Sequence, residues 1–138
     1  MFQVGLMHFR NIGDGRGNLT AIEGEKDVPF SIRRVYYITG VDADVERGYH
    51  SHKKLHQVLL CLNGSVKVRV YNGRERETIL LDRPNLGLYI GPMVWREMFE
   101  FSPQCVMLVL ASELYDETDY IRDFDEYLKD ALPYFNGE

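Results

Sequence analysis

Residues 57–73 read QVLLCLNGSVKVRVYNG, and this stretch determines the expected fold class. The run 57–62 is apolar on both faces, which is typical of a strand buried between two layers. Asn63-Gly64 is a turn dipeptide, and the valines of 66–71 then alternate with polar residues, as in a strand with one face toward water. A second Asn-Gly turn follows. The stretch therefore predicts antiparallel β structure.

The same alternation of short strands and turns continues on both sides of this stretch. Turn residues recur at intervals of about ten residues, which is typical of a sandwich or a closed barrel. Residues 11–18 read as a loop or hairpin turn and 19–23 as extended chain. Further strands are expected at 2–9, 33–39, 77–81, 87–90, 94–101 and 105–111.

The end of the chain has a different pattern. Residues 115–132 carry apolar side chains at helical spacing, with acidic residues early, and Pro133 is expected to limit the helix. With 138 residues, 45% of them hydrophobic, the chain is long enough for one core. We therefore expect residues 1–138 to form a single all-β domain, a sandwich or closed barrel with a short C-terminal helix.

The charge and the apolar runs argue against nucleic acid and membrane partners. The net charge is -5, whereas both partners attract a basic field. No apolar run approaches the roughly 20 residues of a membrane span, and the N-terminus lacks the pattern of a signal peptide. Cys61 and Cys105 lie in apolar stretches, as buried thiols do. A soluble protein of the reducing cytoplasm is expected.

His50 and His52 form the most informative pattern in the chain. Alternate residues of a strand share a face, so the two imidazoles project to one side. Gly, His-x-His and a third ligand five residues on form the first half of the cupin metal motif, but the third position here is Gln57. The second half, GLYIGPMVW at 87–95, is followed by Arg96 where that motif supplies a histidine. A guanidinium cannot donate a lone pair and an amide is a poor ligand, so we expect acid/base chemistry with no metal and no cofactor.

Neutral imidazole, with an ordinary pKa near 6.5, can accept and return a proton in one turnover. Arginines close to it would hold an anion and stabilise an enolate. Trp95 is interpreted either as a core residue or as a wall of the ligand site. The arginines considered as substrate contacts are Arg16, Arg34, Arg47, Arg96 and Arg122.

These segments together resemble one enzyme family, the cupin-fold dTDP-4-keto-6-deoxyglucose 3,4-ketoisomerases, which make 3-keto sugars for later amination. The resemblance covers nearly the whole chain. Its segments are GNLTAIEG at 17–24, RVYYI at 34–38, RGYHSHKKL at 47–55, QVLLCLNGS at 57–65, GLYIGPMVW at 87–95 and YDETDYIR at 115–122.

The resemblance implies an all-β jelly-roll barrel of the cupin type, a double-stranded β-helix. It also implies a metal-independent isomerase that binds a dTDP-linked 4-keto-6-deoxy sugar in the mouth of this barrel. It also implies a homodimer with exchanged N-terminal strands. His50 and His52 would carry protons, Tyr37 would place a hydroxyl beside the sugar, and Arg47 and Arg122 would contact the anion.

Two points stay open at this stage. Trp95-Arg96-Glu97-Met98 resembles family members that give the gluco product, whereas Gly-Arg-Gly around Arg16 resembles those that give the galacto epimer. The run RGYH at 47–50 also resembles the related sugar-nucleotide 3,5-epimerases, and a non-catalytic sugar-binding cupin is a further alternative. A metal-dependent cupin dioxygenase is disfavoured by Gln57 and Arg96.

Overall fold

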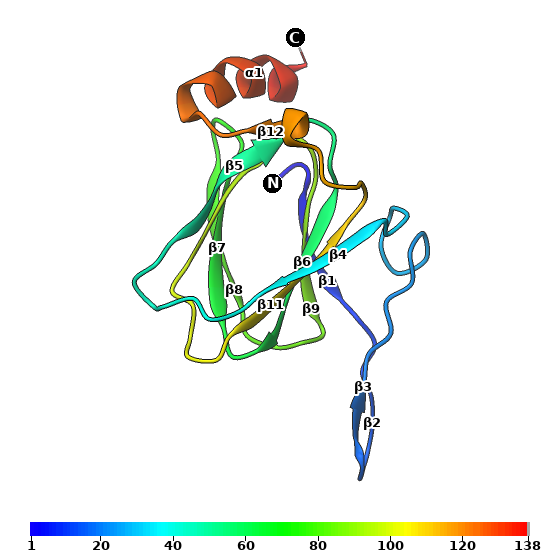
Figure 1. Cartoon of the computed structure of the whole chain (residues 1–138). Coiled ribbons are helices and arrows are strands. Elements are labelled where there is room, and N and C mark those ends of the chain that lie inside the picture. The colour runs from blue at the N-terminus through cyan, green and yellow to red at the C-terminus, as the bar shows by residue number, and fades with distance from the viewer. Residues whose placement is uncertain (138) are drawn as a thin grey trace.

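The computed structural model describes residues 1–137 and consists mainly of two five-stranded antiparallel sheets that form a barrel (Figure 1). The first sheet has the order β1 (Val4–His8), β9 (Leu86–Ile90), β6 (Gln57–Asn63), β11 (Val106–Ala111) and β4 (Arg34–Ile38). The second has the order β12 (Tyr120–Ile121), β5 (Arg47–His52), β10 (Trp95–Phe99), β7 (Val66–Tyr71) and β8 (Arg76–Leu81). The prediction of an all-β jelly-roll barrel is confirmed.

The interior of the barrel is apolar over most of its length. Alternate residues of β7 and β10 are buried, and they meet buried residues of β6, β9 and β11 from the facing sheet. This core contains Val68, Met98, Leu88 and Met107. This core holds the two sheets at a fixed separation. At one end of the barrel, polar side chains replace the apolar ones and form a cluster.

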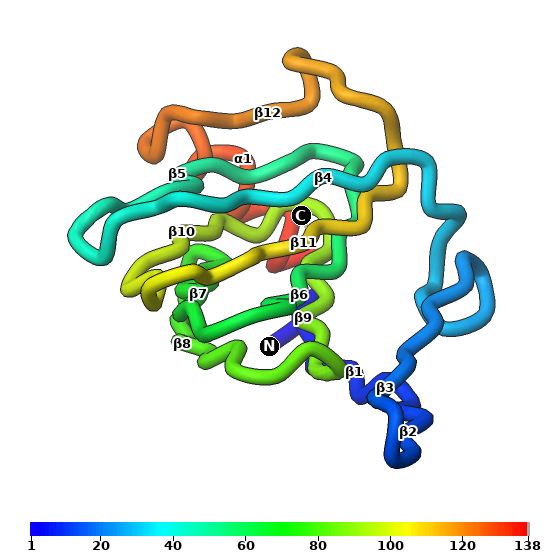
Figure 2. Tube along the Cα trace, turned by 60° about the horizontal axis from the view of Figure 1, so that its bottom comes forward, coloured from blue at the N-terminus to red at the C-terminus, as the bar shows by residue number. Residues whose placement is uncertain are grey.

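An N-terminal extension lies outside the barrel. After β1, residues Ile12–Asp14 and Gly17–Leu19 form a small hairpin, β2 and β3, that projects from the barrel (Figures 1 and 2). The segment that follows returns to the first sheet, where Val28 and Phe30 pack on its outer face. Residues 20–23, which were expected to be extended, form no strand.

The C-terminal segment differs from the single helix that the sequence predicts. Residues Glu117–Asp119 form a 3-10 turn, β12 pairs with β5, and α1 begins only at Phe124 because the side chain of Asp123 caps it by accepting from the Glu126 N–H. The prediction that Pro133 limits the helix is also wrong. The helix continues to Asn136, where Gly137 in the left-handed region ends it. Helix α1 packs across one end of the barrel (Figure 1).

None of the helices in residues 1–137 has both the length and the apolar composition needed to cross a membrane.

Candidate active site

His50 and His52 lie together inside the barrel at the end covered by β12. Their ring centroids are 4.9 Å apart and the rings meet edge to face. The ring of Tyr120 on β12 lies against both, at 5.0 Å from His50 and 4.3 Å from His52. The sequence prediction that the two histidines share a face is confirmed. The ring of Tyr120 packs against both imidazoles and so restricts their rotation.

A bulge between β5 and β10 sets the position of His50. Gly48 and Tyr49 both have positive φ, at 90° and 60°, and the pairing shifts register between Arg96 and Glu97. As a result His50 lies opposite Arg96. A side chain at position 48 would come within 2.9 Å of the Arg96 carbonyl oxygen, so the close approach of the strands requires glycine.

Arg96 is the most buried charged group of the site, with 1% of its surface exposed. Its guanidinium donates to the Gln57 side-chain oxygen and to the Val94 carbonyl, and Gln57 in turn donates to the Tyr36 hydroxyl at 3.0 Å. Burial lowers the pKa of Arg96 to about 10, so it stays protonated at neutral pH. A cation here would repel a metal ion, and Arg96 and Gln57 occupy the two positions at which the metal motif supplies ligands beside the histidines.

Asp119 orients His52. The two side chains are 3.2 Å apart, from Nδ1 to Oδ2, and the other carboxylate oxygen of Asp119 accepts from the backbone N–H of Lys54 at 2.9 Å. With its proton on Nδ1, His52 donates to Asp119 and keeps a lone pair on Nε2. That Nε2 atom is buried and has no hydrogen-bond partner among residues 1–137. A buried acceptor without a partner is suited to take a proton from a bound substrate.

Both histidines are held neutral. Burial, followed by the charge of Arg96, lowers the pKa of His50 to about 3, and the same causes lower the pKa of His52 still further. At neutral pH both imidazoles are therefore free bases. This is the protonation state that proton abstraction requires.

A cavity of about 460 Å³ opens beside His52. Its walls combine the carboxylate of Asp119 and the ring of Tyr120 with three cations, and it is large enough for part of a sugar nucleotide. The cations are Arg33, Arg34 and Lys54. Arg34 also stacks on Tyr36 and Tyr115, at 5.4 and 5.7 Å from their ring centres. Arg34 is thus close to the histidines, as the sequence predicts.

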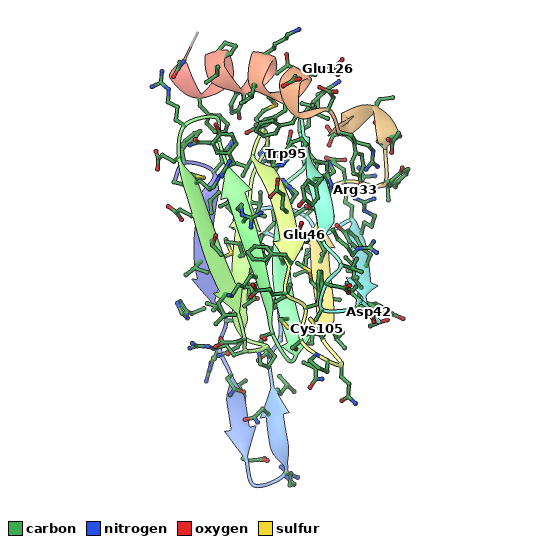
Figure 3. The ribbon with its side chains drawn as sticks, turned by 90° about the vertical axis from the view of Figure 1, so that its left-hand side faces the viewer. Arg33, Asp42, Glu46, Trp95, Cys105 and Glu126 are labelled. Atoms are coloured by element: carbon green, nitrogen blue, oxygen red, sulfur yellow. The ribbon has the colours of Figure 1, made fainter. Side chains whose placement is uncertain are left out.

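Two aromatic predictions need correction. Tyr37 is 70% exposed on the outer face of β4, and its neighbour Tyr36 is the tyrosine that points inward. Trp95 also lies on the outer face of its strand, packed beneath α1 against Tyr127 (Figure 3). In both cases the alternation of the strand places the adjacent residue in the site and this one outside it.

Three predicted arginines lie apart from the histidine pair within one chain. Arg16 is at the tip of the β2–β3 hairpin, almost fully exposed and paired with Asp14 at 2.9 Å. Arg47 is exposed at the start of β5. Arg122 is held by Glu117 at 2.8 Å and covers the Tyr120 ring at 4.2 Å, so it borders the site through that ring.

Sequence reasoning did not select three residues that build the site, namely Asp119, Tyr120 and Tyr36. Asp119 and Tyr120 were assigned to a helix, and a carboxylate in an acidic run gives no signal of its own. The sequence signal that could have located Asp119 is the capping residue Asp116. Its side chain accepts from the Thr118 N–H and begins a short 3-10 turn, after which the chain is extended.

The model of the FdtA family, described as WxcM-like, C-terminal, matches residues 2–131. The chain belongs to this family.

Relatives with known names agree with that assignment. TDP-4-oxo-6-deoxy-alpha-D-glucose-3,4-oxoisomerase of Aneurinibacillus thermoaerophilus is 55% identical over 90% of this chain and 89% of its own. The QdtA 3,4-ketoisomerase of Thermoanaerobacterium thermosaccharolyticum, solved as a mutant with TDP-4-keto-6-deoxyglucose, is 60% identical over 98% of both chains, with a TM-score of 0.96. The WlaRB TDP-quinovose 3,4-ketoisomerase of Campylobacter jejuni is 46% identical over 94% of this chain and 99% of its own, with a TM-score of 0.91.

Proposed function

We propose that this chain is an isomerase that converts TDP-4-keto-6-deoxyglucose into a TDP-3-keto-6-deoxyhexose. The observation that carries the proposal is the pair of neutral, edge-to-face histidines inside the barrel. They occur in a chain 55% and 60% identical to relatives named 3,4-oxoisomerase and 3,4-ketoisomerase. Two free imidazoles side by side match a reaction that removes one proton and returns another.

The proposed reaction moves a ketone by one carbon without redox chemistry. The C-4 ketone acidifies the C-3 proton, and a histidine removes it, so that the electron pair forms the C-3 to C-4 double bond of an enediolate. The imidazolium formed in this step returns its proton to the C-4 oxygen, which becomes the hydroxyl of the product. The second imidazole takes the proton of the C-3 hydroxyl as the C-3 ketone forms and delivers it to C-4. Two protons are removed and two are returned, so atoms and charges balance.

His52 is the better candidate for the initial base. Asp119 holds its Nδ1 proton, so the unpartnered Nε2 atom has its lone pair free and the charge of the resulting imidazolium is balanced. His50, 4.9 Å away, would then exchange the proton at C-4. Arg96 supplies a fixed positive charge for the enediolate.

The cavity beside His52 would receive the nucleotide end of the substrate. Its lining has three cations, Arg33, Arg34 and Lys54, and three carboxylates, Glu113, Asp116 and Asp119, so a phosphate contact depends on which cation is unpaired. Arg33 is bonded to Glu113 at 2.9 Å, whereas Arg34 has a buried Nε without a partner in residues 1–137. Arg34 is therefore the first candidate for the pyrophosphate.

Incubation of TDP-4-keto-6-deoxyglucose with EDTA-treated protein in D2O, followed by NMR, tests this function. Ketone migration to C-3 with deuterium at C-4 is expected, and the ring couplings give the gluco or galacto configuration. Deuterium at C-5 with an unmoved ketone would mean a 3,5-epimerase. An unchanged, unlabelled sugar would mean a binding protein.

We also infer that the chain, as one domain, works as a homodimer in the cytoplasm and supplies a deoxy-aminosugar pathway. A 3-keto sugar is a substrate for amination, and two buried free thiols 3.6 Å apart are consistent with a reducing compartment. The β2–β3 hairpin supports the dimer because it holds Ile12 and Leu19 more than half exposed. β1 pairs with β9 of its own chain, so the hairpin is the segment that would reach the partner and bring Arg16 to it.

A further inference from the structure

A second cavity, of about 290 Å³, lies on the outer face of the sheet that carries the histidines. Its walls include four aromatic rings, Tyr49 of β5, Tyr71 of β7, Trp95 of β10 and Phe124 at the start of α1. The inward neighbours of these strand residues belong to the core or to the catalytic cluster, so the two cavities lie on opposite faces of one sheet. No residue lines both.

The rings form a rigid slot. Tyr71 and Phe124 are nearly parallel, with centroids 5.8 Å apart, and Trp95 meets Phe124 edge to face at 5.1 Å. Trp95 is 3% exposed, and its indole N–H donates to Glu97 at 2.9 Å. These contacts hold Phe124 in place, and a planar ring can pack against the exposed faces of Phe124 and Tyr49 at little cost in side-chain entropy.

Among residues 1–137, one cation beside these rings, Arg76, has no anionic partner. Glu97 is paired with Arg69 and with Trp95, and Arg69 stacks on Phe99 at 4.3 Å. Arg76 lies 4.9 Å over the Tyr71 ring, and within residues 1–137 its guanidinium makes no hydrogen bond or ion pair. It is therefore available to an anionic group at the edge of a stacked ring.

We propose that this outer cavity, which we call the Trp95 pocket, binds a planar aromatic anion. The ring would pack against Tyr49 and Phe124, which are 40% and 36% exposed, and its carboxylate or phosphate would bind Arg76. Two sources share this chemistry, a nucleoside monophosphate and a small aromatic carboxylic acid. This site is separate from the proposed catalytic cavity and does not depend on the reaction assigned there.

Trp95 is the single tryptophan of the chain, so its indole N–H gives one cross-peak in an 15N-correlated NMR spectrum. Thymidine monophosphate and indole-3-acetate, titrated separately, serve as probes of the two sources. At least one is expected to shift this cross-peak saturably. Arg76→Ala and Arg76→Gln should lower the affinity for that probe by about tenfold, which corresponds to the loss of one charge-assisted hydrogen bond.

Arg74→Ala is the matched control, because Arg74 is also exposed and lies in the β7–β8 turn just before Arg76, but does not line the pocket. It should leave the affinity unchanged, and all three variants should keep the isomerase rate. A shift with one probe alone supports the site and identifies its source. The proposal is overturned if neither probe moves the Trp95 peak at millimolar concentration, or if the Arg76 variants bind as well as wild type, as they would if the probe occupied only the histidine cavity.

Discussion

Asp119 touches a histidine and not a reacting carbon, so its role is to position a proton. Its carboxylate accepts at two places, from His52 and from the Lys54 N–H. An asparagine could keep the second bond through its amide oxygen. It would present an N–H group to Nδ1, however, and so favour the tautomer whose lone pair points away from the cavity.

We therefore expect Asp119→Asn to lower kcat by about 100-fold and to change KM little. Steady-state assays of the isomerisation measure both. Asp125→Asn, the same change at an exposed site in the first turn of α1, should behave as wild type. If kcat stayed within a factor of two in Asp119→Asn, the carboxylate would have only a structural role.

Replacing His50 or His52 with asparagine should reduce turnover by at least about 100-fold, because each removes a proton carrier. The affinity for TDP should stay the same, since the cations of the neighbouring cavity are intact. Calorimetric titration with TDP and the NMR assay measure the two quantities on one preparation. Near wild-type turnover in both variants would rule out the histidine mechanism.

Individual residues differ in how far the sequence alone predicts their positions. The pair His50 and His52 could be assigned because one strand with period two contains both. Tyr36 and Tyr37 are neighbours of the same type, and only the position of β4 relative to Gln57 determines which one faces inward. Arg96 was recognised as an unusual residue at a ligand position, but its hydrogen bonds to Val94 and Gln57 come from tertiary packing.

The bulge in β5 is the element on which the site geometry depends. Gly48 has a φ of 90°, and its Cα faces the Arg96 carbonyl at a distance that leaves no room for a side chain. Gly48→Ala should destabilise the protein by more than about 1 kcal/mol, because alanine is strained at positive φ and the clash separates β5 from β10. Urea unfolding measures the loss.

The control for this variant is Gly15→Ala, since an added Cβ at position 15 meets no atom within 4 Å. Its stability should stay within about 0.5 kcal/mol of wild type. Equal stability of the two variants would show that the bulge tolerates a side chain at position 48. In that case the argument for the placement of His50 would fail.

Strands were easier to predict than the C-terminal segment for a physical reason. Each strand from β6 to β11 has its own turn and its own buried face, so a local pattern determines it. Residues 115–123 carry a helical apolar pattern too, but two aspartate caps, at 116 and 123, divide the segment, and the edge of β5 draws Tyr120 into a strand. Pairing across sixty-eight residues of chain, from His52 to Tyr120, is not visible in a local window.

The stability of the whole molecule should fall in mild acid because of the histidines. The pKa of His50 is about 3 in the fold, against an ordinary 6.5, so between these values the unfolded chain binds the extra proton and stability rises with pH. Stability is therefore lost as the pH drops below about 6.5. From pH 6.5 to pH 5, His50 alone accounts for about 1.5 kcal/mol.

Urea unfolding of wild type and His50→Asn at several pH values in this range measures the effect. Between pH 6.5 and pH 5, the unfolding free energy of the variant should fall by about 1.5 kcal/mol less than that of wild type. The range lies above the ordinary pKa values of the carboxylates, so their contribution is small. Equal slopes would mean that the pKa of His50 is the same in the folded protein as in the unfolded chain.

The proposed dimer can be tested by the mass of the protein in solution. Light scattering after size exclusion should give twice the chain mass of 16.1 kDa, and Ile12→Asp with Leu19→Asp should give the single mass. A monomeric wild type would contradict the dimer. The position of Arg16 could not be predicted from one chain, because the hairpin that carries it makes its contacts, under this proposal, with another copy.

Strands β5 and β10 have functional groups on both faces, with Arg96 directed into the barrel and Trp95 and Glu97 directed to the outer pocket. A one-residue insertion in such a strand would exchange the two faces. Changes at Tyr49, Trp95 and Glu97 of the outer pocket lie next in sequence to His50 or Arg96 of the proposed catalytic site. Directed evolution of this enzyme should accordingly find its freedom in β7 and β8, where inward residues only fill the core, and should lose activity most often through changes in β10.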